Sequence, residues 1–368
     1  MRITTSAQRV FVAIGLAAVV LGGSGCANPE QPAGGGAEST DKGFKIGLLL
    51  PESKTTRYES FDRPLIEQKL KQLCPKCEVL YQNADQDPSK QQSQAEAMLT
   101  AGAKVLILDA VDAKAASGIV TDAKDQGVPV VAYDRLATGP VDYYVSYDNK
   151  KVGETQGKAL LDAVSAGGDP KRGKIVMING APTDPNAADF KAGAHAVLDG
   201  KVSVGKEYDT PDWSPDKAQQ EMEQAITAVG KDKIIGVYAA NDGTAGGAIA
   251  AMKSAGFDKL PPVTGQDAEL AAIQRILAGQ QHMTVYKAIK PEADIAADMA
   301  VALATGKKYQ GETVTKNNGD ADVASVLLEP VSVTKDNIKD TIIADKFYTA
   351  DQICTSAYAK ACADAGIS

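Results

Sequence analysis

The sequence has little histidine and no long apolar run beyond its first residues, and each shortage excludes a class of protein. Its two histidines, His195 and His282, lie far apart in a chain of 368 residues. A zinc centre needs several Cys and His ligands at short spacing, so we expect no metal site. No motif indicates any other cofactor. After residue 21, no stretch approaches the roughly 20 apolar residues of a membrane-spanning helix.

Basic residues are outnumbered by acidic ones. The precursor has 39 Lys and Arg against 47 Asp and Glu, and removal of an N-terminal segment with Arg2 and Arg9 leaves 37 against 47, a net charge of −10. Such a surface repels phosphate backbones, so we expect no nucleic acid as partner. Residues 44–368 are enough for two domains of ordinary size.

The first 25 residues have the layout of an export signal. Arg2 and Arg9 precede an apolar run, Val10–Leu21, that is too short to span a bilayer. Small residues then end at Cys26, which resembles a bacterial lipobox, although Gly23 stands where the usual pattern has leucine. We expect a signal peptide at 1–25 and lipid attachment at Cys26. An ordinary cleaved signal with an incidental cysteine is the alternative.

The next segment, 26–43, is rich in Gly, Pro, Ala, Ser and Glu and has no apolar period. Such a composition buries too little surface to order itself, so we expect a disordered tether behind the lipidated Cys26. The protein would then be anchored by lipid alone to the outer face of the cell membrane, or be periplasmic if Cys26 is not modified.

Four further cysteines follow, as Cys74 and Cys77 and as Cys354 and Cys362. Export permits disulfides, and four cysteines permit three pairings. The short separation within each couple favours the local pairing, Cys74–Cys77 and Cys354–Cys362. A Cys-x-x-Cys motif also occurs in redox and zinc sites, but zinc would need more ligands nearby.

Short β-branched runs alternate with helical stretches along the chain. The runs are apolar at nearly every position, which is typical of parallel strands covered by helices on both faces. Gly102 and Gly127 stand just after helices, where a left-handed cap is favoured. The pattern predicts repeated βα units with right-handed crossovers. In the first half we expect strands at 44–50, 78–82, 105–109 and 128–133, and helices at 64–73, 89–101 and 113–126.

The pattern then begins again, which predicts a second α/β half. Ligands of open α/β sheets bind outside the carboxyl ends of the strands, so two facing halves would place two such edges around one cleft. That geometry suits closure on a small molecule by a hinge. The expected strands are 174–179, 202–208, 234–239, 262–264 and 283–286, with helices near 187–198, 215–229, 243–255, 268–277 and 291–304.

Planar polar groups gather where these strands end. Each one alone has an ordinary explanation, because Asp and Asn commonly cap the next helix and an Asp-Arg couple is commonly a solvated ion pair. Together on one edge they favour a ligand site. The groups are Tyr133-Asp134-Arg135, Asn186, Asn241-Asp242, Gln266-Asp267 and Tyr286-Lys287.

A neutral sugar would explain these residue types. Its hydroxyls donate to carboxylates and accept from the planar forks of Arg and Asn, and its carbon face lies well on an aromatic ring. The single tryptophan, Trp213, lies between Pro211 and Pro215 in a stretch that we interpret as a loop, so burial by local packing is not expected. Tyr58, just before a helix, suits the opposite face of the sugar.

Six stretches in order resemble the D-xylose-binding proteins of the periplasmic ribose/galactose-binding class, over essentially the whole chain after the tether. They are Val130–Arg135, Ser146–Gly153, Asn241–Ala248, Gly265–Leu270, Met283–Lys287 and Asn337–Thr341. The resemblance implies a periplasmic binding protein type I fold, with two doubly wound parallel-sheet domains joined by a hinge. It also implies three crossovers, giving an N-terminal lobe of 44–152 plus 286–328 and a C-terminal lobe of 153–285 plus 329–368.

The resemblance implies a function as well. The expected protein is a monomer that captures a monosaccharide, D-xylose first, and hands it to the permease subunits of an ABC importer. Glucose, galactose, arabinose or a sugar alcohol remain open, as does signalling to a membrane sensor. By the family's motifs, the sugar-binding residues are Arg57, Tyr58, Asp134, Arg135, Asn186, Trp213, Asn241, Asp267 and Lys287.

Two other functions have less support in the sequence. A glycosidase could use Asp134 and Asp267 as acid and nucleophile, but this needs a fixed carboxylate separation that a sequence does not give, and both residues have neighbouring donors that suit binding. A sugar-sensing repressor would need an N-terminal helix-turn-helix, where this chain has a signal and a linker. We expect no enzyme and no catalytic residue.

Overall fold

The computed structural model describes residues 38–367, so the predicted signal peptide and the lipidation site Cys26 lie outside the described residues. The end of the predicted tether, 38–43, forms a turn on the folded domain. The backbone N–H of Glu38 donates to the Ala304 carbonyl (3.0 Å), and Gly43 adopts φ +77°. Within 38–367, no helix has both the length and the apolar character needed to cross a membrane.

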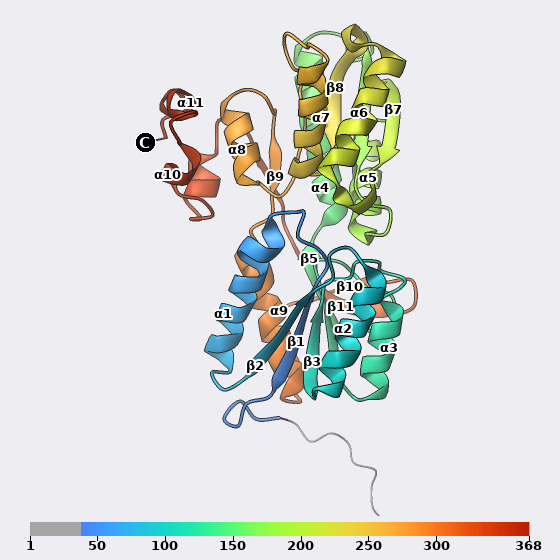
Figure 1. Cartoon of the computed structure of the whole chain (residues 1–368), viewed down its shortest axis with the longest axis vertical. Coiled ribbons are helices and arrows are strands. Elements are labelled where there is room, and N and C mark those ends of the chain that lie inside the picture. Colours follow the sequence, from blue (N-terminus) through green and yellow to red (C-terminus); the bar gives the residue numbers. More distant parts are fainter. Residues whose placement is uncertain (1–37, 368) are drawn as a thin grey trace, which may run out of the picture. The chain divides into compact units, whose positions relative to one another are not determined.

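A seven-stranded sheet forms the first lobe, drawn at the bottom of Figure 1. Its order is β10-β11-β5-β4-β3-β1-β2, and every neighbouring pair is parallel except β10 and β11. Two of its strands come from near the C-terminus. The strands are β1 (Lys45–Leu50), β2 (Glu78–Asn83), β3 (Ala103–Leu108), β4 (Val130–Tyr133), β5 (Tyr143–Tyr147), β10 (Val314–Asn317) and β11 (Asp322–Leu328).

Helices cover both faces of this sheet, as the apolar strands require. Along β3, Val105 and Ile107 face one core while Leu106 and Leu108 face the other, in accordance with the two-residue period of a strand. Helices α1 (Arg63–Leu73) and α9 (Ile289–Ala304) pack against the first core, and α2 (Pro88–Thr100) and α3 (Ser117–Asp125) against the second.

The second lobe has a parallel sheet in the order β7-β6-β8, made of β7 (Val204–Asp209), β6 (Lys174–Asn179) and β8 (Ile234–Ala239). Single bridges, Val237 to Val263 and Gln266 to Val285, continue it toward β9 (Thr284–Tyr286). The strand expected at 262–264 is therefore wrong, because only Val263 pairs there. One face carries α4 (Asn149–Ala166) and α5 (Pro185–Leu198), and the other α6 (Pro215–Val229) and α7 (Asp242–Ser254).

The sequence reading did not include β5 and α4. Glycines weaken the helical pattern of α4, but Gly153 has a packing role: a Cβ there would stand 1.9 Å from the Phe190 carbonyl oxygen of α5. The glycine lets the two helices approach closely. Both predicted left-handed caps are confirmed, with φ +87° at Gly102 and +70° at Gly127.

A C-terminal segment packs beside α8 (Leu270–Leu277) and β9, which pairs with β12 (Val331–Val333). It holds the π-helical turn η4 (Lys339–Ile343) and the short helices α10 (Ala350–Ile353) and α11 (Ala359–Asp364), at the left of Figure 1. A disulfide joins Cys354 to Cys362, and another joins Cys74 to Cys77, the same local pairing that the spacing favours.

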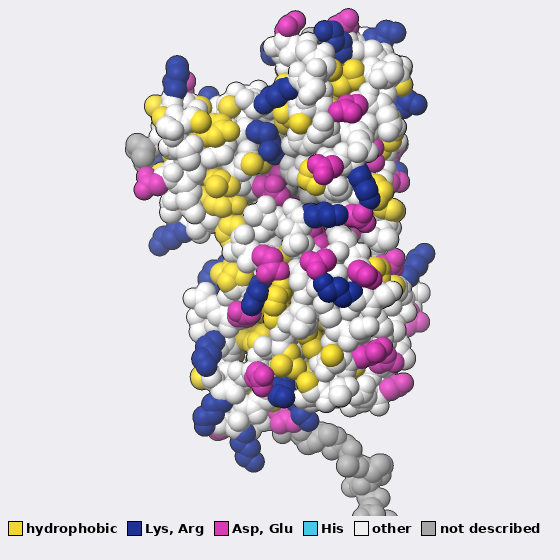
Figure 2. Space-filling view, in the orientation of Figure 1, with side chains coloured by type: hydrophobic (Ala, Val, Ile, Leu, Met, Phe, Trp, Pro, Cys, Tyr) yellow, Lys and Arg dark blue, Asp and Glu magenta, His cyan; other side chains and the backbone are white. Residues whose placement is uncertain are grey.

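Three connections run between the lobes: from β5 to α4, from β9 to α9 and from β11 to β12. The exact lobe boundaries given above stay predictions. On the face drawn in Figure 2, acidic and basic side chains are interspersed rather than gathered in fields of one sign.

Candidate functional site

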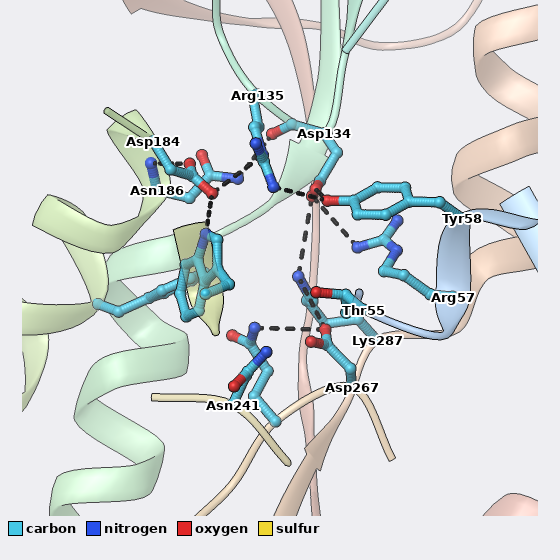
Figure 3. Close-up of a pocket in the computed structure, with 13 residues that line it drawn as sticks. Thr55, Arg57, Tyr58, Asp134, Arg135, Asp184, Asn186, Asn241, Asp267 and Lys287 are labelled. Atoms are coloured by element: carbon cyan, nitrogen blue, oxygen red, sulfur yellow. Dashed lines mark hydrogen bonds and ion pairs between the residues drawn. The ribbon is translucent and has the colours of Figure 1, made fainter. Parts of the chain in front are cut away.

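Loops at the carboxyl ends of strands from both lobes surround one small cavity (Figure 3). All nine residues expected at the ligand site line it, and each is at most 7 % exposed. They are Arg57, Tyr58, Asp134, Arg135, Asn186, Trp213, Asn241, Asp267 and Lys287. The wall also includes four further residues: Gln266, which belongs to the polar groups at the strand ends, and three that the sequence does not indicate, Thr55, Asp184 and Phe190.

On the first-lobe side, Asp134 is the central acceptor. It follows β4 directly and takes up a left-handed backbone, φ +54°. Its Oδ1 lies 3.4 Å from Nη1 of Arg57 and 3.8 Å from Nζ of Lys287. Burial would raise the pKa of Asp134, but the charges of Arg57 and Lys287 outweigh it and lower the pKa to about 2. The carboxylate is therefore ionised throughout the neutral range.

Arg57 is fixed from behind the cavity. It stands just before the π-helical turn η1 (Tyr58–Asp62), and Asp62 accepts from its Nη2 at 2.6 Å and from its Nε at 3.0 Å. Glu292 of α9 accepts from Nη2 at 3.0 Å, and the Tyr133 hydroxyl donates to Asp62. Burial raises the pKa of Glu292 to about 8 although Arg57 lowers it. These contacts hold the guanidinium before any ligand arrives.

Arg135, the next residue after Asp134, reaches the second lobe. Its Nε lies 2.9 Å from Oδ2 of Asp184, and its Nη2 donates to the Tyr58 hydroxyl at 3.1 Å. That hydroxyl donates in turn to Asp134 (3.3 Å). Tyr58 therefore bridges the Asp-Arg couple by its polar end, a contact that the stacking role expected from sequence did not include.

Helix starts supply much of the second-lobe wall. Asp184 caps α5 by accepting from the backbone N–H of Asn186 at 2.9 Å. The Asn186 side chain donates to the backbone carbonyl of Asp134 at 2.9 Å, so it crosses between the lobes. Asn241 caps α7 in the same way, its Oδ1 accepting from the Thr244 N–H at 2.9 Å.

Trp213 is buried, although the sequence led us to expect no burial by local packing. A short turn with left-handed Asp212 (φ +59°) and Trp213 (φ +52°) directs the indole inward, where only 4 % of the residue is exposed. The ring fits over Gly180, whose missing side chain would stand 2.0 Å from it, and packs edge-on to Phe190. Its Nε1 donates to Asp184 at 3.0 Å.

Lys287, which follows β9, joins carboxylates of the two lobes. Its Nζ lies 3.4 Å from Oδ1 of Asp267 and 3.8 Å from Oδ1 of Asp134, and 5.6 Å from the ring centre of Phe190. Burial alone would lower the pKa of Lys287, but the two aspartates raise it. The ammonium group stays charged.

The charges of the lining balance. Arg57, Arg135 and Lys287 carry three positive charges, and three carboxylates, Asp134, Asp184 and Asp267, face them. A charged ligand would leave one charge buried without a partner, which is costly. The cavity thus suits an uncharged molecule that both donates and accepts many hydrogen bonds. In 38–367, no group of three His, Cys, Asp or Glu side chains could hold a metal ion.

Comparison with known proteins identifies the family to which the chain belongs. Residues 46–308 match the family model described as a periplasmic binding protein domain. The D-xylose-binding periplasmic protein of Escherichia coli is 40% identical over 318 residues, which cover 85% of this chain and 93% of that protein. A multiple sugar-binding periplasmic receptor of Rhizobium radiobacter is 34% identical over 336 residues, covering 86% and 94%.

A solved structure agrees with these relatives. An ABC transporter solute-binding protein from Clostridium phytofermentans, with bound β-D-glucose, has a TM-score of 0.78 and 30% identity, covering 84% of this chain and 99% of that one. The chain belongs to the periplasmic binding protein family, and its fold is the type I fold of that family. The family and fold predicted from the sequence are confirmed.

Weak signals mark the four additional lining residues. Asp184 precedes Pro185 at a helix start and so reads as an ordinary cap. Phe190 stands one helical turn after Asn186, and Gln266 adjoins Asp267 within the stretch Gly265–Leu270. Thr55 has no sequence signal beyond its closeness to Arg57.

Proposed function

We propose that this protein is an exported receptor that captures a monosaccharide, D-xylose before others, and delivers it to an ABC permease. The observation that carries the proposal is the charge-balanced lining: three cations and three carboxylates around one small cavity. Sugar hydroxyls can accept from the former and donate to the latter without adding charge.

The choice of D-xylose rests on the relatives. The E. coli protein at 40% identity is named for that sugar, while the Rhizobium radiobacter receptor is named for several. Glucose, galactose, arabinose and sugar alcohols are the alternatives.

In this proposal, the permease recognises the form in which the two lobes have closed on the sugar. Contacts already cross between the lobes at Arg135–Asp184 (2.9 Å) and from Asn186 to the Asp134 carbonyl (2.9 Å). A ligand that bridges the same residues would stabilise this arrangement over an open one.

A binding role suits the acids better than catalysis. A glycosidase acid must hold a proton near neutral pH, whereas Arg57 and Lys287 overcome the effect of burial and lower the pKa of Asp134 to about 2. The relatives named above are binding proteins and a receptor. We therefore propose no enzymatic activity.

Calorimetric titration of the exported chain tests the proposal. The panel is D-xylose, D-glucose, D-galactose, L-arabinose and myo-inositol, and we expect D-xylose to bind most tightly. The exposed Asp125→Asn variant, at the end of α3 and not among the lining residues, should match the wild type. Tighter binding of another sugar would contradict the choice of xylose, and binding of none would contradict the function.

Lipid anchoring is a separate proposal that rests on Cys26 and the Gly- and Pro-rich segment after it. Cys26→Ser should move the protein from the membrane fraction to the soluble exported fraction. Immunoblots of the two fractions check this, and unchanged membrane association of the variant would contradict the anchor.

A further inference from the structure

One buried carboxylate lies behind the cavity wall. Asp242 is the first residue of α7, directly after the lining residue Asn241, and its exposed fraction is 0 %. It is not among the residues that line the cavity. A carboxylate is stable in a buried position only where hydrogen-bond donors surround it. The donors around Asp242 therefore show which segments of the chain it connects.

Those partners come from the loop that carries Asp267 and from the strand after it. Oδ2 of Asp242 accepts from the backbone N–H of Glu269 and from the Thr284 hydroxyl, both at 2.9 Å. Oδ1 accepts from Nε2 of Gln281 at 2.7 Å. The backbone N–H of Asp242 also donates to the Gln266 carbonyl at 3.0 Å. One residue therefore fastens the loop 266–269 and β9 to the start of α7.

The backbone of the loop 266–269 adopts an unfavourable conformation. Asp267 has φ +88° and Ala268 has φ +49°, two successive residues with side chains in the left-handed region. Such a backbone persists only where surrounding contacts determine it. Here the Ala268 N–H donates to the Thr284 hydroxyl (3.2 Å), which itself donates to Asp242. Without the carboxylate, the Glu269 N–H and the Thr284 hydroxyl would lose their acceptor, and the loop would keep the backbone bond from Asp267 to the Val285 carbonyl (2.9 Å).

We propose that Asp242 is a positioning residue of the ligand site, which holds the loop 266–269 so that Asp267 faces the cavity and pairs with Lys287. The part of this inference that concerns affinity rests on the proposed sugar-binding function. The part that concerns the loop does not.

The donors around Asp242 require an oxygen at both positions. Gln281 cannot turn its amide to compensate, because its Oε1 accepts from Nε of Arg275 (3.0 Å) and its Nε2 also donates to the Met283 carbonyl (3.0 Å). In Asp242→Asn, one oxygen becomes an N–H₂ group that faces a donor. The change keeps the size of the side chain and removes one acceptor.

The charged and titratable groups around Asp242 make a pH readout possible. They are Arg275 from α8, Asp267 and Glu269 from the loop, and Tyr348 from the C-terminal segment. Burial raises the pKa of Asp242 to about 7, although Arg275 and Gln281 lower it. Because this pKa lies above the ordinary value of about 3.9, the closed loop favours the protonated carboxyl, and ionisation as pH rises through 7 should weaken the arrangement.

The test combines hydrogen exchange with titration, on the exported chain and its Asp242→Asn variant. In ligand-free protein, amides of 267–269 should exchange faster in the variant, while the strands of both lobes keep their protection. With D-xylose at pH 8, the variant should bind about tenfold or more weakly. Corrected for the intrinsic pH dependence of amide exchange, protection of 267–269 in the ligand-free wild type should decrease from pH 6 to pH 8, and it should change less in the variant.

Two comparisons keep the outcome decisive. Thr284→Val removes one donor to Asp242 and should raise exchange at 267–269 to a smaller extent, which covers the case of a poorly folded Asp242→Asn. Asp125→Asn, at the end of α3 in the first lobe and exposed, should leave exchange and affinity unchanged. Unchanged exchange at 267–269 in both Asp242→Asn and Thr284→Val overturns the inference. Absence of sugar binding in the wild type overturns the proposed function, while exchange still decides the role of Asp242.

Discussion

The two walls of the cavity differ in what holds them. On the first-lobe side, Arg57, Asp134 and Arg135 belong to an ionic network with further buried acids behind it, Asp62 and Glu292 on Arg57. On the second-lobe side, Asp184 and Asp267 pair with Arg135 and Lys287, and the other predicted ligand residues, Asn186, Trp213 and Asn241, are uncharged. The first wall is an ionic floor backed by further acids, and the second wall combines two carboxylates with neutral groups.

This difference has an energetic consequence. Removal of one member of a buried ionic network leaves its partners charged and unpaired, whereas removal of a neutral group leaves at most a lost hydrogen bond. Substitutions in the first-lobe wall should therefore damage both stability and affinity. Substitutions of the neutral groups in the second-lobe wall should reduce affinity and leave stability less affected.

Arg135→Ala should have the largest effect. It leaves Asp184 and Asp109 buried, the latter with Arg135 Nε 3.5 Å from its Oδ1. We expect a loss of about 3–5 kcal/mol in the free energy of unfolding and about a hundredfold or more in sugar affinity. Urea denaturation and calorimetry measure the two. Arg135→Lys keeps the charge without the planar fork and should fall in between. Stability like that of the wild type in the alanine variant would contradict the ionic-floor description.

Trp213→Phe should come next and affect mainly affinity. The ring remains, but Asp184 loses the indole N–H that donates to it at 3.0 Å. A loss of about tenfold in affinity corresponds to one such hydrogen bond. Because the chain has a single tryptophan, sugar should also change the intrinsic fluorescence of the wild type. No change in either measurement would mean that Trp213 does not contact the ligand.

The pH dependence of stability should test the buried acids behind the first-lobe wall. Burial raises the pKa of Glu292 to about 8 in the folded state, above the value of about 4.3 for an unfolded glutamate. The folded state then binds the extra proton between these values, so ionisation of Glu292 reduces stability as pH rises from about 5 to 8. Thermal unfolding of Glu292→Gln should show a weaker decline over this range. A decline equal to that of the wild type would exclude Glu292 as its source.

The smallest effect is expected at the rim. Lys316 of β10 pairs with Asp189 of α5 at 3.1 Å, but the two side chains are 41% and 40% exposed. Exposed pairs contribute about 0–1 kcal/mol, so Lys316→Ala should change affinity by less than about fivefold. Titration at low and high salt checks this. A loss as large as that of Arg135→Ala would show that surface contacts between the lobes, rather than the cavity walls, control binding.

Much of the site could be predicted because its residues follow strands at one edge. Asp134 and Asn241 are visible in this way, since a strand's end fixes on which edge the next residue lies. The sequence could not give Trp213 its place, because its burial depends on left-handed backbone at Asp212 and on space above Gly180, which lies 33 residues earlier. Nor could it assign Asp184 a ligand-site role, because a capping aspartate before a proline looks the same whether or not an arginine from the other lobe reaches it.

In the fold, the alternation of strand and helix predicted the layers well. The pattern failed where tertiary contacts replace local preference, as in α4, whose glycines serve close helix packing. It also failed at 262–264, where the short apolar run forms one bridge rather than a strand.

The position of β11 in the first sheet has a consequence for how the chain is made. Strand β5 pairs with β4 on one side and with β11 on the other, and β11 is not synthesised until residue 328. Until then β5 presents an unpaired edge, and one sheet face still lacks α9. An emerging chain therefore cannot complete its first domain before nearly all of the second has been produced. Late residues thus complete the early half of the molecule, which delays its folding until synthesis is nearly finished.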